Sequence, residues 1–337
     1  MRQINPLESP DWDAKLTARP DFTFFHGAAW QRVLTATYGF TPLFLAHENT
    51  LWPLMEVNSW LTGKRGVSLP FTDNCEPLGG DQKAFGEIFT AAVELGKKRG
   101  WKYLEGRGGR NILTDATTSI SFFGHSVTLD KEEAKMFEKM DGSMRRAIRK
   151  AEKENVTVEI SQSESAMRDF FHLQCLTRKR HGLPPQSLEF FLNIQKYILS
   201  QNLGFVAVAA HGGKKIAASV YFFLGGKAIY KYGASDFAHQ DLRGTNLVMW
   251  AAMRKLARDG VQTLHLGKTS LEHDGLRRFK LNLGATEETL DYFRYDFRRC
   301  QFVTDKDSVA GWHNRVFGTL PLPATRLAGR LLYKHWA

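Results

Sequence analysis

A pattern of helix, glycine and strand occurs twice in this chain of 337 residues. Residues 83–107 (KAFGEIFTAAVELGKKRGWKYLEGR) show it first, and residues 246–268 (NLVMWAAMRKLARDGVQTLHLGK) repeat it. A predicted β-hairpin precedes each copy, at 42–60 and at 205–223. The unit is common, so chance likeness is the alternative. The matching order of the neighbouring elements favours a duplicated α/β domain.

The second half of the chain predicts a complete series of elements in the order β-α-α-β-β-β-α-β-α-β. Three β-rich runs with glycine-rich turns indicate an antiparallel meander, and serines at 163, 165 and 187 and Asn246 are predicted helix caps. We therefore expect an α/β (α+β) protein with two tandem domains, each a mixed, mostly antiparallel sheet flanked by helices. The predicted segments are residues 1–140, 141–305 and a tail, 306–337. The expected elements are strands 156–160, 205–210, 216–224, 227–235, 262–267 and 287–296, and helices 167–180, 187–202, 247–259 and 274–283.

Cysteine use and hydropathy bound the class of protein. Cys75, Cys175 and Cys300 lie far apart without metal-ligand spacing, which predicts reduced thiols, no disulfide framework and no bound metal. The N-terminus lacks the apolar core of a signal peptide. No apolar run approaches the roughly 18 residues that span a bilayer. The expected location is the cytoplasm.

The formal net charge of +11 is concentrated in the second half. Residues 1–140 hold 16 Lys and Arg against 17 Asp and Glu, whereas residues 141–337 hold 30 against 18. This asymmetry predicts a polyanionic partner there, namely a nucleotide cofactor, a nucleic acid or an anionic membrane. A domain that is simply basic is the alternative.

Two cationic segments are candidate phosphate sites. Arg243, Gly244, Thr245 and Asn246 occupy a turn and the start of a predicted helix, where backbone N–H groups and the helix dipole favour an anion. Residues 143–153 (SMRRAIRKAEK) carry five cations and one acid. If this segment is helical, Arg145 and Arg149 share one face, while Arg146, Lys150 and Lys153 share another. We predict polyanion contact through Arg145 and especially Arg149; a solvated helix face is the alternative.

A third cationic segment, residues 275–285 (GLRRFKLNLGA), places cations among apolar residues after a strand. Arg277 and Lys280 lie three apart and so share a helix face, and Lys268 belongs to the strand end before them. Such cations suit an anion or a developing oxyanion. We expect the apolar positions to dock this helix and the cations to face a site; a solvated basic face is again the alternative. Tyr230 and Tyr232 alternate along their strand and so are expected on one face. The general base stays open among these two and the polar residues at 236–241, and Tyr232 is our candidate. No GxSxG, HExxH or Walker A signature occurs.

Four stretches resemble the FemAB family, tandem-domain relatives of the GNAT acyltransferases, over about residues 20–300. They are SMRRAIRKAEKENVTVEI, YKYGASDFAHQDLRGTNLVMWAAM, LHLGKTS and GLRRFKLNLGATEETL. WPLMEVNSW, GVSLPFTDN and WKYLEGRGG also resemble FemAB-like proteins found near exopolysaccharide and PEP-CTERM sorting genes.

The resemblance implies transfer of an acyl or aminoacyl group to an amine of a cell-envelope or exopolysaccharide precursor, without a metal. The donor would be acyl-CoA or aminoacyl-tRNA, bound by the second domain, with the acceptor on the first domain and a cleft between them. Lys280, in the family's Phe-Lys pair, would stabilise the tetrahedral intermediate. The GNAT phosphate-loop pattern is degraded, because Asp241, Gly244 and Asn246 stand at its three places. This departure counts against acyl-CoA.

The tail and the overall charge leave other functions open. From about Thr325 a helix would align Arg326, Arg330 and Lys334 in a basic stripe beside apolar positions. It would either pack on the second domain or lie on the inner face of an anionic membrane as a peripheral contact. The rival functions are a non-catalytic nucleic-acid-binding protein, using aromatics such as Phe170, Phe171 and Tyr197, and a membrane-associated scaffold.

Overall fold

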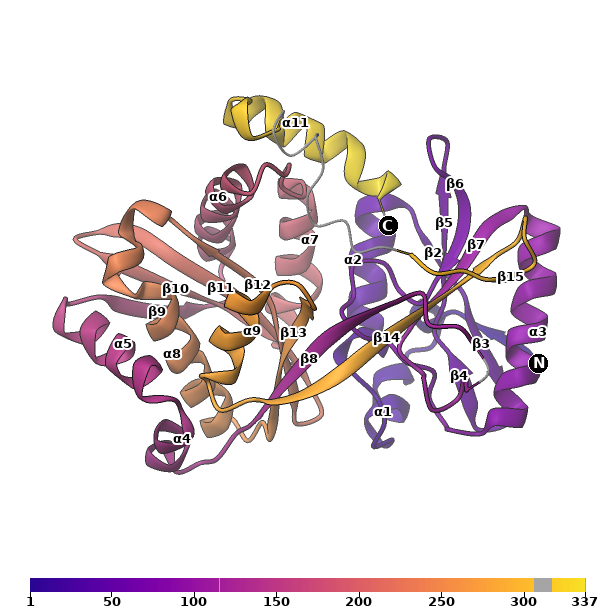
Figure 1. The fold of residues 1–337 in the computed structure, drawn as a ribbon, viewed down its shortest axis with the longest axis horizontal. Coiled ribbons are helices and arrows are strands. Elements are labelled where there is room, and N and C mark those ends of the chain that lie inside the picture. Colours follow the sequence, from indigo (N-terminus) through magenta and orange to yellow (C-terminus); the bar gives the residue numbers. More distant parts are fainter. Residues whose placement is uncertain (115, 306–316, 337) are drawn as a thin grey trace. The chain divides into compact units, whose positions relative to one another are not determined.

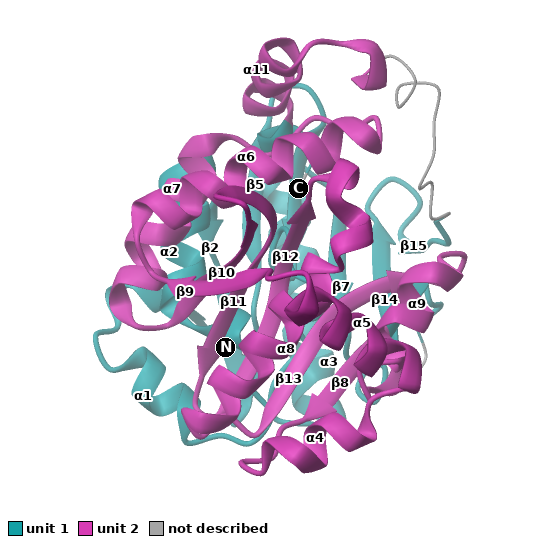
Figure 2. Cartoon of the chain, turned by 90° about the vertical axis from the view of Figure 1, so that its left-hand side faces the viewer, with its two compact units in different colours: residues 1–123, 289–308, 333–337 teal, residues 124–288, 309–332 magenta. Residues whose placement is uncertain are grey.

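A computed structural model describes residues 1–114, 116–305 and 317–336, and the chain divides into two compact units (Figure 2). The first unit contains residues 1–123, 289–308 and 333–337, and the second contains 124–288 and 309–332. Strands β8 (Ile120–Thr128) and β14 (Thr286–Asp296) each begin in one unit and end in the other. The units therefore differ in extent from the predicted segments 1–140, 141–305 and 306–337. Their assignment to acceptor and donor stays a prediction.

The first unit contains two β-sheets (Figure 1). The smaller has the strand order β1-β3-β4, and the strands of the larger that belong to this unit lie in the order β2-β5-β6-β7-β14, with β15 paired to β14. The bounds are β1 (Arg2–Ile4), η1 (Pro6–Glu8), α1 (Trp12–Thr17), η2 (Phe24–His26), α2 (Ala28–Tyr38), β2 (Thr41–Pro42), β3 (Phe44–His47), β4 (Thr50–Trp52), β5 (Met55–Ser59), β6 (Gly63–Val67), α3 (Gln82–Arg99), β7 (Trp101–Arg107), β15 (Gln301–Phe302) and η5 (Tyr333–His335).

The first predicted copy of the repeat is confirmed, but the stretch before it differs from the second copy. Helix α3 ends at Gly100, whose left-handed φ of 70° leads directly into β7, as the pattern predicts. Residues 42–60 are instead divided between two sheets, since β3 pairs with β4 whereas β5 pairs with β2 and β6. Pro53, which cannot donate a ladder hydrogen bond, lies at this break.

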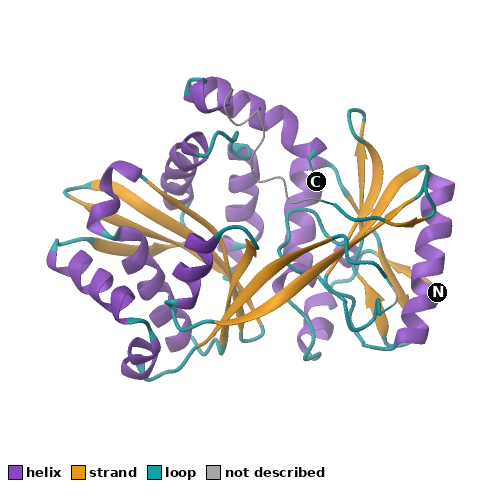
Figure 3. Cartoon of the chain, in the orientation of Figure 1, coloured by secondary structure: helices purple, strands orange, loops and turns teal. Residues whose placement is uncertain are grey.

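The second unit follows the predicted element order. Its strands lie in the order β13-β12-β11-β10-β9, antiparallel except for the parallel pair of β12 and β13. Figure 3 shows this sheet between two layers of helices, one containing α5 and α8 and the other α6 and α7. The bounds are α4 (Glu133–Lys139), α5 (Gly142–Lys153), β9 (Thr157–Ser161), α6 (Glu164–Arg180), α7 (Leu188–Tyr197), η3 (Leu199–Gln201), β10 (Gly204–His211), β11 (Lys214–Leu224), β12 (Lys227–Ser235), η4 (Phe237–Leu242), α8 (Gly244–Arg258), β13 (Thr263–Ser270), α9 (Asp274–Leu281) and α11 (Leu322–Leu332).

The predicted helix caps are confirmed in two of three helices. The Ser163 and Ser187 hydroxyls accept N–H bonds from Ala166 and Phe190 at 3.1 and 3.2 Å. The prediction that Asn246 caps the next helix is wrong. Residues 237–242 form a 3-10 turn, and Arg243 then takes a left-handed φ of 57°, so α8 begins at Gly244.

The tail packs on the second unit over residues 322–332. Helix α11 contacts α6, and its Gly329 lies so close to Pro185 that an added Cβ would stand 1.8 Å from the carbonyl oxygen. The packed alternative therefore holds for this segment, and the helix begins before the predicted Thr325. Residues 306–316 lie outside the described residues. Within the described part of the chain, no helix combines the length and apolar character needed to cross a bilayer.

Candidate functional site

Strands β12 and β13 separate along their length. Their parallel register covers only Lys227–Ile229 against Thr263–His265. Beyond these pairs, β12 continues to Ser235 and β13 to Ser270 before each leads towards a helix, α8 or α9. The opening between parallel strands brings the starts of two helices to the end of the sheet, a place where α/β proteins commonly bind ligands.

A β-bulge in β12 separates the two tyrosines of this strand. Val220 pairs with Tyr232 whereas Tyr221 pairs with Tyr230, so one residue of β12 is extra. Tyr230 packs against Tyr221 on the α8 side, and burial raises its pKa to about 12. Tyr232 packs against the α7 ring of Phe191 on the opposite side. The expectation that both tyrosines share one face is wrong, and Tyr232 as general base stays a prediction.

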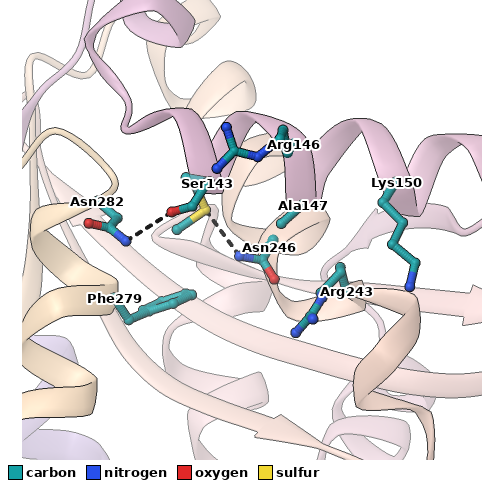
Figure 4. Close-up of a pocket in the computed structure, with 9 residues that line it drawn as sticks. Ser143, Arg146, Ala147, Lys150, Arg243, Asn246, Phe279 and Asn282 are labelled. Carbon is teal, nitrogen blue, oxygen red and sulfur yellow. Dashed lines mark hydrogen bonds between the residues drawn. The ribbon is translucent and has the colours of Figure 1, made fainter.

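A pocket of about 420 Å³ lies at the start of α8 (Figure 4). Helix α5 supplies one wall, α8 and the residue before it another, and α9 a third. The Asn246 amide donates to the Met144 sulfur at 3.1 Å, and the Asn282 amide donates to the Ser143 hydroxyl at 3.3 Å. The lining residues are Ser143, Met144, Arg146, Ala147, Lys150, Arg243, Asn246, Phe279 and Asn282.

The charge of this pocket is positive. Arg146, Lys150 and Arg243 line it, and none of the described residues that line it is acidic. The first N–H groups of a helix have no intrahelical acceptor, so the start of α8 adds a partial positive charge. Three cations, two amides and a helix start together form a set of donors that suits phosphate oxygens.

The pocket contains only part of the predicted phosphate-binding set. Arg243 and Asn246 line it, and Gly244 and Thr245 form the start of α8. Arg145 and Arg149 do not line it; the Arg149 guanidinium lies 5.4 Å from the centre of the Phe137 ring. A Cβ on Gly244 would lie 2.9 Å from the Ile216 Cδ1, so packing on β11 alone accounts for this glycine.

Sequence reasoning missed five lining residues of functional type. Arg146 and Lys150 were assigned to the same helix face, but the other face of α5 was favoured. Ser143 and Asn282 carry no specific signal, and Phe279 is noted only as the neighbour of Lys280 in the Phe-Lys pair. Their common property is position, because the first turn of α5 and the last turn of α9 meet beside α8.

Lys280 is buried, with 3% of its surface exposed. Its ammonium donates to the carbonyl oxygens of Gly267 at 2.7 Å and Lys268 at 3.1 Å, both on β13. The neighbouring Phe279 faces the pocket, while Leu281 is exposed. We expected the apolar residues of this helix to dock it and the cations to face a site. Lys280 instead docks α9 on the end of β13 and brings a positive charge there.

Arg277 belongs to an ion-pair chain. Its guanidinium binds both oxygens of Glu287 at 2.7 and 2.8 Å, and the Nε2 of the fully buried His125 lies 3.0 Å from the same carboxylate. The pair with Arg277 lowers the pKa of Glu287, and burial, aided by the charge of Lys280, lowers the pKa of His125. Arg277 is thus held against β14. The side chain of Lys268 does not line the pocket.

Comparison with known proteins finds a family model that matches the stretch containing the pocket residues and Lys280. Residues 138–285 match the family model described as acetyltransferase (GNAT) domain. This stretch, somewhat less than half of the chain, is therefore similar to GNAT domains. No curated protein matches the sequence. Among the described residues, no group of three His, Cys, Asp or Glu side chains is placed to hold a metal ion.

Solved structures share the fold across both units. FemX aligns with 14% identity and a TM-score of 0.66, covering 86% of this chain and 97% of that one. The C-terminal domain of a protein described as a lysylphosphatidylglycerol synthetase from Agrobacterium fabrum aligns with 15% identity, a TM-score of 0.55 and coverages of 90% and 93%. A tandem GNAT protein from the clavulanic acid biosynthesis pathway aligns with 9% identity, a TM-score of 0.52 and coverages of 77% and 83%. The predicted fold class is confirmed.

Proposed function

We propose that the second unit transfers an acyl or aminoacyl group from a phosphate-bearing donor to an amine. The observation that carries this proposal is the basic pocket at the start of α8, within the stretch similar to GNAT domains. The pocket is open, lacks acids and offers cations from two elements that are far apart in sequence. A solvated basic helix face would not require α5 and the α8 turn to present cations to one space.

The pocket would hold the donor phosphates, and the end of β13 would hold the reacting carbonyl. In the transfer the amine nitrogen bonds to the carbonyl carbon, the C–S or C–O bond of the donor breaks, the amine loses a proton and the leaving thiol or hydroxyl gains one. The buried charge of Lys280 lies where it would favour a developing oxyanion. Arg243, Asn246, Arg146 and Lys150 would position the donor.

Acyl-CoA and aminoacyl-tRNA are the two donor classes that fit this chemistry. Both carry an activated acyl group, a thioester in one and an ester in the other, and both are polyanions with phosphates for the pocket to bind. The predicted acceptor is an amine-bearing precursor of the cell envelope or of an exopolysaccharide. The fold shared with FemX and with the lysylphosphatidylglycerol synthetase domain supports this class of acceptor by analogy alone. The rival nucleic-acid-binding function loses two of its proposed stacking residues, because Phe170 and Phe171 are buried.

Two double variants of α5 test the donor site. Arg146→Gln/Lys150→Gln removes two cations that line the pocket, and Arg145→Gln/Arg149→Gln removes two cations of the same helix that do not. Calorimetry would compare coenzyme A, acetyl-CoA and a bulk pool of charged tRNA. We expect one donor class to bind the wild type and to bind the first variant roughly 10- to 100-fold more weakly. The second variant should bind nearly as the wild type does.

The donors differ in how they respond to salt. Binding of tRNA should fall steeply as salt rises, whereas binding of coenzyme A should fall gently because fewer phosphates are contacted. Failure of both donors to bind the wild type, or equal losses in the two double variants, would remove the proposed donor site.

A further inference from the structure

The turn between β5 and β6 exposes two adjacent large apolar side chains. Trp60 has 82% of its surface exposed and Leu61 has 51%. Trp336, near the other end of the chain, has 45% exposed and also belongs to the first unit. We call these three residues the aromatic tip. Single exposed apolar residues are ordinary, whereas a protruding group of them marks a contact surface.

The aromatic tip rests on a bonded support. The His335 Nδ1 and the Ser59 hydroxyl lie 2.8 Å apart, and the His335 carbonyl accepts bonds from the Thr62 hydroxyl and from the Arg65 guanidinium, both at 2.9 Å. The His335 ring also packs edge-on against Trp60, with centres 5.3 Å apart. Figure 1 shows the C-terminal segment beside β5 and β6. Hydrogen bonds and a ring contact therefore join the β5–β6 turn to the C-terminal segment.

Exposed cations surround this end of the first unit. Strand β6 runs parallel to β7, so the β5–β6 turn lies at the same sheet end as the start of β7 and the end of α3. The end of β14 joins them, because the Phe297 N–H bonds the Lys102 carbonyl at 3.0 Å. Two carboxylates here are held by neighbours, Glu56 by Arg99 and Asp296 by the Arg299 N–H. The exposed cations are Lys64, Lys97, Lys98, Lys102, Arg298, Arg299 and Lys334.

We propose that the aromatic tip and these cations form a contact surface for an anionic lipid bilayer. Tryptophan side chains favour the boundary between headgroups and acyl chains, and cations near that boundary are attracted by anionic headgroups. A nucleic acid would also attract the cations. A leucine beside a tryptophan on a protruding turn, however, suits insertion between lipids better than stacking on bases. The inference is independent of the transfer reaction in the second unit.

Vesicle sedimentation with the full chain tests this surface. The vesicles would contain either phosphatidylcholine alone or equal parts of phosphatidylcholine and phosphatidylglycerol. We expect the wild type to sediment with the anionic vesicles. The affinity of Trp60→Ser/Leu61→Ser for these vesicles should be lower by about tenfold or more. Lys97→Gln/Lys98→Gln should also weaken binding by about tenfold, and added salt should act in the same direction.

The matched control is Leu327→Ser/Leu331→Ser, which removes two leucines of α11 that are each 58% exposed. It should bind as the wild type does. Absence of wild-type binding to anionic vesicles, equal binding to both vesicle types, or an equal loss in the control variant would overturn the proposal. The proposal would also be overturned if the wild type bound tRNA but not vesicles and if Trp60→Ser/Leu61→Ser lost this tRNA binding. Thermal unfolding of each variant shows that the fold is retained.

Discussion

A lysine with 3% exposure needs partners that offset the loss of its hydration, and Lys280 has two backbone carbonyls of β13. Lys280→Met leaves those carbonyls without this donor and removes the charge beside the proposed reaction centre. We expect the free energy of unfolding to fall by about 1–3 kcal/mol and turnover to fall by roughly 100-fold. Lys280→Arg retains the charge and is the control. A folded Lys280→Met protein with full turnover would contradict the catalytic role.

His26 in the first unit predicts a pH dependence of stability. The ring is fully buried, its Nδ1 accepts the Thr23 N–H at 3.0 Å, and its Nε2 donates to the Glu76 carbonyl at 2.8 Å. Burial lowers its pKa from 6.5 to about 4. Between pH 6.5 and pH 4 the His26 ring is therefore protonated in the unfolded chain but neutral in the folded protein. The free energy of unfolding is undiminished above pH 6.5 and falls as the pH falls towards 4, by about 3 kcal/mol in total.

His26→Gln provides the comparison, because an amide can replace the donor to Glu76 but does not titrate. Urea unfolding of both proteins between pH 7 and pH 4 should show a smaller loss in the variant. Other histidines with lowered pKa, such as His125, affect both proteins alike. Glu105, whose pKa is lowered to about 2, adds its loss only below about pH 4.5. Parallel curves for the two proteins would show that His26 is protonated at no cost.

The sequence predicts which cations share a helix face, but not which of those faces lines the pocket. Helical spacing correctly separates Arg145 and Arg149 from Arg146 and Lys150. Which pair faces the pocket depends on how α5 packs against α8, and local spacing does not contain that information. Asn246 shows the same limit, because it becomes a pocket residue only once the turn before it fixes where α8 begins.

At the scale of elements, the contact of α8 with β11 depends on Gly244. An alanine there would place its Cβ 2.9 Å from the Ile216 Cδ1. We expect Gly244→Ala to lower the free energy of unfolding by about 1–3 kcal/mol through overpacking. Adding Ile216→Val, which removes the clashing methyl group, should restore part of the loss. Denaturant unfolding measures both effects.

Gly86 in α3 is the matched control, since nothing lies within 4 Å of its added Cβ. Gly86→Ala should stabilise the protein by up to about 1 kcal/mol through helix propensity. If Gly244→Ala stabilises equally, α8 does not depend on close approach to β11.

Helices and strands of the second unit were predictable because their apolar spacing and serine caps are local signals. The bulge in β12 was not, because it arises from the register between two strands. Its effect is large: Tyr230 and Tyr232 would share a face in a regular strand, and the bulge sends them to opposite sides of the sheet. The break at Pro53 likewise depends on which sheet each neighbouring strand joins.

At the scale of the whole molecule, β8 and β14 determine which fragments can fold. Fragment 141–305 follows the predicted boundary, whereas fragment 124–288 is the larger part of the second compact unit and has the same length. The first lacks the buried side chains of Val127, Leu129, Met136 and Met140. Each contributes about 1.5–3 kcal/mol when fully buried, and together they rival the stability of a typical domain, about 5–15 kcal/mol.

We therefore expect cooperative thermal unfolding of fragment 124–288 and none of fragment 141–305, measured by circular dichroism. Cooperative unfolding of both fragments at the same temperature would show that residues 124–140 are dispensable for folding. The sequence repeat predicts two domains, but it does not predict that β8 and β14 each begin in one unit and end in the other. Pairing between distant segments leaves no local pattern in the sequence.

Because each unit is built from separate stretches of the chain, the order of synthesis determines which parts can fold first. Domains commonly fold from the N-terminus as the chain leaves the ribosome. Here the first unit needs residues 289–308 and 333–337, and the second needs residues 309–332, whereas residues 124–288 are all available earlier. The larger part of the second unit can therefore fold before the first unit is complete. Until β14 has been synthesised, the strand edge of β7 that β14 later covers lacks this partner, and a chaperone or a second nascent chain can bind there.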